Sequence, residues 1–96
     1  MSAYIVVNCE VTDPAKYEQY KQVAPQIIAQ YGGRYLVRGG ATGVLEGGWQ
    51  PKRVVILEFP TLAAANKFYH SPEYQAACDL RAGAALMDMI AVEGVA

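Results

Sequence analysis

The hydrophobic pattern of residues 3–11 predicts a β-strand, because successive side chains of a strand point to opposite faces and many of these are β-branched. One face carries Ala3, Ile5, Val7 and Cys9, and the other carries Tyr4, Val6, Asn8 and Glu10. Both faces are largely apolar, and a sheet of this kind needs a cover on both sides. We therefore expect helices on one face and the sheet of a second subunit on the other.

A helix is predicted next, from Pro14 to about Gln30. Asp13 can cap the free amides of the first turn, and proline suits the first helical position. Pro25 lies inside the pattern, so we expect the helix to kink or restart there. Two glycines at 32 and 33 end it. The apolar stripe that supports this helix consists of Tyr17, Tyr20, Ala24, Ile27, Ile28 and Tyr31.

Two further strands are predicted in the middle of the chain. The first spans residues 34–46 and is interrupted by Gly39 and Gly40, which we interpret as a bulge, a bend or a close approach by another chain. Residues 47–51 are interpreted as the loop of a β-hairpin. The second strand spans residues 53–59, and its uninterrupted apolar run at 54–57 is typical of a strand inside a sheet.

The last third of the chain predicts two helical segments and a strand. Thr61 begins a helix, Ser71 and Pro72 begin a shorter one, and Gly83 ends that segment. Residues 86–94 form the last strand. The resulting order, β-α-β-β-α-β, indicates an α+β fold with an antiparallel sheet and helices on one face. We expect residues 1–96 to form a single domain.

Composition adds an expectation of self-association. Of the 96 residues, 53% are hydrophobic and only 18% are charged, against about 25% charged residues in typical soluble chains. A small domain with excess apolar surface can cover it with a partner subunit, so a homodimer is expected.

Charge and hydropathy exclude other partners. The net charge is −1 and the basic residues form no run, so we expect no nucleic acid. We see no signal peptide and no apolar run of the roughly 20 residues that a membrane helix needs. The expectation is a cytoplasmic protein with no membrane partner. One histidine and two isolated cysteines give no metal-ligand spacing.

Two charged residues in the predicted strands are candidates for chemistry. Arg38 can hold a ligand carboxylate through its guanidinium group. Glu58 follows the most apolar run of the chain, and a buried carboxylate with a raised pKa can act as a general base. The alternative is structural: Arg38 can form an internal ion pair with Glu58 or Glu46, and a pair with Glu58 would account for both residues.

Polar and aromatic side chains supply the remaining candidates. Asn8 can orient a ligand, or it can satisfy a backbone group at a strand end. His70 can move a proton near neutral pH, or it can simply end a helix. Tyr69 can line a ligand pocket, or it can belong to an amphipathic helix face. Trp49, in the predicted hairpin loop, is interpreted as an interface anchor.

Five separated segments resemble the domain of unknown function 1330 family. They are YGGRYLVRGG (31–40), WQPKRVVILEFP (49–60), FYHSPEYQ (68–75), Arg81 and VEG (92–94). The resemblance covers essentially the whole chain. It implies a ferredoxin-like domain that dimerises sheet to sheet as a dimeric α/β barrel. It implies no settled activity and no catalytic residues.

Together these observations favour a homodimer that binds a small carboxylated or aromatic metabolite between helices and sheet. Arg38, Asn8 and Tyr69 would bind the ligand, and Glu58 or His70 would move a proton. No cofactor is expected. A cofactor-independent isomerase or oxygenase and a non-catalytic binding or sensing module both remain open.

Overall fold

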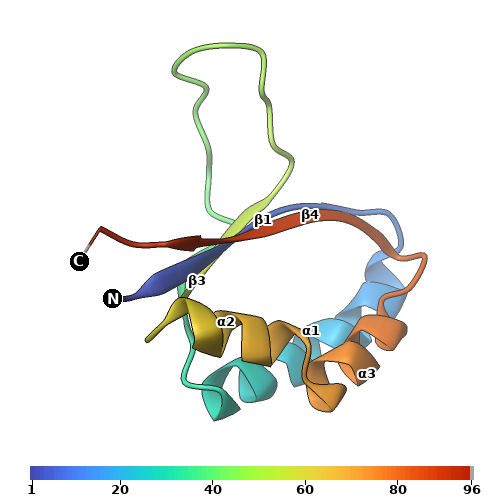
Figure 1. Cartoon of the computed structure of the whole chain (residues 1–96). Coiled ribbons are helices and arrows are strands. Elements are labelled where there is room, and N and C mark those ends of the chain that lie inside the picture. Colours follow the sequence, from blue (N-terminus) through green and yellow to red (C-terminus); the bar gives the residue numbers. More distant parts are fainter. Residues whose placement is uncertain (96) are drawn as a thin grey trace.

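A computed structural model describes residues 1–95. One four-stranded antiparallel sheet carries all three helices on a single face, and a long loop projects from its opposite side (Figure 1). The strands follow the spatial order β2-β3-β1-β4. In chain order the elements are β1 (Ala3–Val11), α1 (Pro14–Gln30), β2 (Arg34–Arg38), β3 (Val54–Phe59), α2 (Leu62–Tyr69), α3 (Pro72–Leu80) and β4 (Ala85–Glu93). This arrangement confirms the predicted ferredoxin-like α+β fold.

The helices begin where the sequence predicts, and each start has a local cause. The side chains of Asp13, Thr61 and Ser71 accept hydrogen bonds from backbone N–H groups three residues later. Proline occupies the first turn of both α1 and α3. The expected restart at Pro25 is wrong, because α1 continues through this residue as one helix. Pro25 has no backbone N–H, so one helical hydrogen bond is lost at this position. Pro25 is half-buried beside the buried Ala24, and this packing offsets the loss.

The core lies between the helices and the inner face of the sheet. Strand β1 buries alternate side chains from Ala3 to Cys9, as its pattern predicts. Helix α1 contributes Tyr17, Tyr20, Ala24 and Ile28. Aromatic rings join the layers, and the centroids of Phe68 and Tyr74 lie 4.4 Å apart. This two-layer packing of helices on one sheet leaves the outer face of the sheet uncovered.

The predicted strand over residues 34–46 is wrong beyond Arg38. Gly39 donates the last ladder hydrogen bond to the Val54 carbonyl at 2.8 Å, and its φ of +73° then turns the chain out of the sheet. The loop is correspondingly longer than the predicted hairpin and covers residues 39–53, called the arm below. The irregularity within β2 lies between Tyr35 and Val37 instead of at the glycines. The remaining strand ends match the predictions or differ from them by one residue.

No helix among residues 1–95 is long and apolar enough to cross a membrane. The same residues contain no group of three or more histidine, cysteine or acidic side chains that could hold a metal ion.

Candidate functional site

A cleft opens between α1 and the inner face of the sheet at its β2–β3 side. Its cavity volume is about 40 Å³, and it opens directly to solvent. The register of β2 and β3 determines which side chains form the sheet-side wall of the cleft, because Tyr35 lies opposite Leu57 and Arg38 lies opposite Val55. These four side chains therefore share the face that looks toward the helices. Met87 and Met89 extend the same wall from β4.

Three cations and no carboxylate line this cleft: Lys21, Arg38 and Arg53. Lys21 forms an exposed ion pair with Glu18 at 3.5 Å. Neither arginine has an ion-pair partner among residues 1–95. The guanidinium carbon of Arg38 lies 4.4 Å from the centre of the Tyr35 ring, which is a cation–π contact. The cleft therefore combines a positive rim with neutral walls.

The two arginines flank the point where the arm leaves the sheet. Arg38 is the last residue of β2, and Arg53 directly precedes β3. An added Cβ at Gly39 would lie 2.5 Å from Arg53 Nε, so only glycine lets this side chain pack across the root of the arm. Burial raises the pKa of Tyr35, and the positive charges of Arg38 and Arg53 each offset part of this rise. Both charges are therefore close enough to affect a side chain of the cleft.

Tyrosines form the other wall of the cleft, on the helix side. The hydroxyl groups of Tyr20 and Tyr74 lie 2.7 Å apart and share a buried hydrogen bond. Burial raises the pKa of both phenols, and for Tyr20 the neighbouring Tyr74 adds to the rise. Burial also raises the pKa of Tyr17. The hydrogen bond that its hydroxyl accepts from Cys9 Sγ, at 3.7 Å, raises this pKa further. These phenols stay neutral near pH 7 and present hydrogen-bonding hydroxyls beside apolar ring surfaces.

Comparison with protein families gives a match over residues 2–95 to the domain of unknown function DUF1330. The chain belongs to the DUF1330 family. A comparison with curated proteins finds no match.

Solved structures similar to this DUF1330 chain share its fold. RPA0582, a protein of unknown function from Rhodopseudomonas palustris, has a TM-score of 0.76 at 18% identity and covers 99% of this chain and 83% of its own. A dimeric ferredoxin-like protein of unknown function from Bacteroides fragilis has a TM-score of 0.62 at 14% identity, covering 97% and 96%. SnoaB, a cofactor-independent oxygenase from Streptomyces nogalater, has a TM-score of 0.64 at 10% identity, covering 99% and 94%. At these identities the likeness establishes the fold alone.

The DUF1330 structure does not bring the five predicted site residues together. Arg38 alone lines the cleft. Asn8 lies on the outer face, and its side-chain oxygen accepts a hydrogen bond from the Lys52 backbone N–H at 3.2 Å. Tyr69 lines a separate groove between α2 and β4. His70 ends α2 at the surface, where its ring packs edge-on against Tyr69 at 5.2 Å between centroids.

The structural pairing predicted between Arg38 and Glu58 is wrong. Glu58 pairs instead with Arg34, whose Nε lies 2.7 Å from its carboxylate oxygen. The strand register is the cause, because Arg34 lies directly opposite Glu58 on the outer face, whereas Arg38 lies opposite Val55 on the inner face. Arg38 is therefore left free to face the cleft.

Sequence reasoning missed Arg53, Lys21 and Tyr35 as members of the cleft in this DUF1330 chain. Arg53 is adjacent to a strand that was predicted, but its role depends on the unpredicted exit of the arm at Gly39. Lys21 follows Tyr20 on α1, and its position at the rim depends on how α1 lies over the sheet. The alternating pattern of residues 34–38 does not by itself place Tyr35 and Arg38 on the same face of the sheet. That placement depends on the break in register between Tyr35 and Val37.

Proposed function

We propose that the protein is a homodimer in which each subunit binds a small carboxylated metabolite with an aromatic or apolar body. One observation carries the ligand assignment: the cleft is lined by Lys21, Arg38 and Arg53 and by no acidic residue. A guanidinium group without a protein partner is matched by a ligand carboxylate, which can accept two parallel hydrogen bonds from one guanidinium fork. The tyrosine rings and methionines support an apolar ligand body.

The homodimer is supported by the uncovered outer face of the sheet. Tyr4, Val6, Val37, Val54, Ile56, Leu86, Ile90 and Val92 project from this side, called the open face below. Leu86 and Ile90 are 66% and 62% exposed in the single chain. Complete burial of such a side chain stabilises by about 1.5–3 kcal/mol. Covering the open face with a second copy would remove this apolar surface from water, and two structural neighbours are described as dimeric.

Binding, as opposed to turnover, is the function that the cleft supports best. Glu58 and His70, the residues predicted to move protons, both lie outside the cleft. The hydroxyls inside it have pKa values raised by burial, which disfavours their ionisation near neutral pH. The cofactor-independent oxygenase SnoaB shares the fold only. An enzyme would consume oxygen or convert its ligand, whereas the proposed module returns the ligand unchanged.

Isothermal titration with benzoate tests the proposal, and the chain supplies a matched control. Arg38 and Arg34 are both exposed arginines of β2, but they lie on opposite faces of the sheet. We expect Arg38→Gln and Arg53→Gln each to weaken benzoate binding at least tenfold, or about 1.4 kcal/mol. Arg34→Gln should leave it unchanged. Equal losses for Arg34→Gln and Arg38→Gln, or no saturable binding by the unmodified protein at millimolar benzoate, would refute the proposal.

A further inference from the structure

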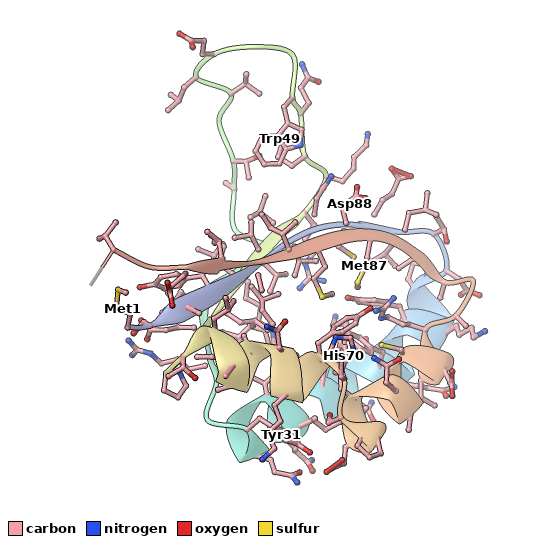
Figure 2. All side chains as sticks on the ribbon, in the orientation of Figure 1. Met1, Tyr31, Trp49, His70, Met87 and Asp88 are labelled. Carbon is pink, nitrogen blue, oxygen red and sulfur yellow. The ribbon has the colours of Figure 1, made fainter. Side chains whose placement is uncertain are left out.

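The arm is the least packed part of the described chain. Every residue from 39 to 50 is exposed. Within residues 1–95, its backbone hydrogen bonds lie only at the two roots, where the N–H groups of Gly39 and Lys52 donate and the carbonyl of Arg53 accepts. Yet its apolar side chains face water: Leu45 is fully exposed and Trp49 is 65% exposed (Figure 2). Packing these side chains on another surface would remove them from water and stabilise the arm.

The outer edge of β4 is a matching unpaired surface. β4 is an edge strand, with β1 on one side and no strand on the other within the described residues. Nine consecutive residues pair with β1 without a break in register, so the backbone N–H and C=O groups of alternate residues point outward along a regular edge. Edge strands that are long, regular and apolar readily accept another strand.

A groove runs beside this edge on the helix side. It lies between α2 and β4 and is lined by Ala65, Tyr69, Met89 and Ala91, among others. The groove carries no charged side chain. It is therefore suited to an aliphatic side chain from a strand laid along β4.

The reach of the arm makes a second copy the occupant that fits this edge. Each limb has about seven residues and extends to about 23 Å, whereas packed sheets lie about 10 Å apart. The arm leaves the sheet on the open-face side, opposite the helices (Figure 1). In a dimer that covers the open faces, the arm is longer than the gap between the sheets and so must run alongside an edge of the partner sheet.

Two edges are available, and β4 is the better one. β2 has only five residues and a register shift between Tyr35 and Val37. We propose that residues 41–46 of one copy add as a strand to the outer edge of β4 in the second copy. Alternation along the added strand would place Leu45 over the groove between α2 and β4, with Val44 and Glu46 on the opposite side.

This inference rests on the homodimer of the proposed function but not on its ligand. It gives a physical reason for the sequence pattern at 41–46, which resembles a strand and yet finds no partner strand in its own subunit. It also ties the cleft to assembly, because Arg38 and Arg53 stand at the two roots of the arm.

Amide hydrogen exchange at two protein concentrations tests the inference. At a concentration where sedimentation shows dimer, we expect slow exchange at residues 41–46 and at those β4 amides that point away from β1. Both sets of amides should lose this protection together when dilution produces monomer, whereas the β4 amides bonded to β1 should keep it. Slow exchange at residues 41–46 that survives in the monomer would show that the arm packs on its own subunit and would overturn the proposal. Fast exchange at residues 41–46 in the dimer would overturn it too.

Two proline variants provide matched controls for each other. Alternate N–H groups of an added strand face its partner, so only one of Val44→Pro and Leu45→Pro removes a hydrogen bond of the proposed ladder. We expect one variant to raise the dimer dissociation constant at least tenfold and the other to change it far less. Equal effects, or no effect from either, would contradict strand addition. A protein that is monomeric at all concentrations would instead remove the homodimer itself, while benzoate titration would still report on the cleft.

Discussion

The hydrogen bond between Tyr20 and Tyr74 should make a measurable and strongly coupled contribution to stability. The two hydroxyls are 2.7 Å apart, and their residues are 9% and 1% exposed. Removing one hydroxyl deletes the bond and leaves the other group buried without this partner. Removing one partner of such a bond and leaving the other buried and unsatisfied costs about 1–3 kcal/mol, more than the net value of the bond itself. We expect Tyr20→Phe to destabilise the fold by about 1–3 kcal/mol.

A double-mutant cycle distinguishes the bond from general packing. Tyr20→Phe and Tyr74→Phe should each be destabilising, whereas the double variant should cost less than the sum of the two by at least about 1 kcal/mol, because it leaves no orphaned hydroxyl. The assay is urea unfolding at one fixed protein concentration, since the stability of the proposed dimer would depend on concentration. Additive effects, or single variants within about 0.3 kcal/mol of the unmodified protein, would refute the reasoning.

The same tyrosines predict a loss of stability at alkaline pH. Burial raises the folded-state pKa of Tyr20 above its ordinary value of 10.0. Above pH 10 the unfolded chain therefore loses protons that the folded chain retains, and stability falls as pH rises. Each such tyrosine contributes a slope of up to about 1.4 kcal/mol per pH unit. The stabilisation is fully present below pH 10, and Tyr20→Phe should reduce the slope measured between pH 10 and 11.

Three further predictions concern the rest of the surface. Ile90→Asp on the open face should convert the proposed dimer to monomer in sedimentation equilibrium. The control Ala63→Asp, at an exposed position of α2, should not. A dimeric Ile90→Asp protein would contradict the proposed interface. Glu58→Gln should cost less than about 1 kcal/mol in thermal unfolding, because its partner Arg34 has a side chain 70% exposed; a loss above 3 kcal/mol would indicate a buried role. His70→Ala should leave benzoate affinity unchanged, because His70 does not line the cleft; a tenfold loss of affinity would contradict its exclusion from the site.

Helix starts and the buried face of β1 could be predicted because their causes are local. Caps at Asp13, Thr61 and Ser71 act within three residues, and strand alternation needs no tertiary information. The end of β2 could not be predicted in this way. Residues 41–46 have strand-like side chains, but a strand also needs a neighbour, and β3 begins only at Val54.

The candidate site was predictable only in part, for the same physical reason. Arg38 is visible in the sequence as a cation in a strand, but its face depends on the break in register between Tyr35 and Val37. The register places Arg34 opposite Glu58, at the far end of β2 from Arg38, and the break turns Arg38 to the inner face. Register is set by pairing across the sheet, so a pattern read along one strand could not settle it.

Methyl NMR of the methionines tests the central claim most directly. The chain has three methionines: Met87 and Met89 line the cleft, and Met1 lies at the exposed terminus and serves as an internal control. Titration with benzoate should shift the Met87 and Met89 methyl signals saturably and leave Met1 unchanged. The neutral analogue benzamide should bind at least tenfold more weakly. Equal affinity for benzamide, or benzoate shifts that spare both cleft methionines, would contradict a carboxylate-binding cleft.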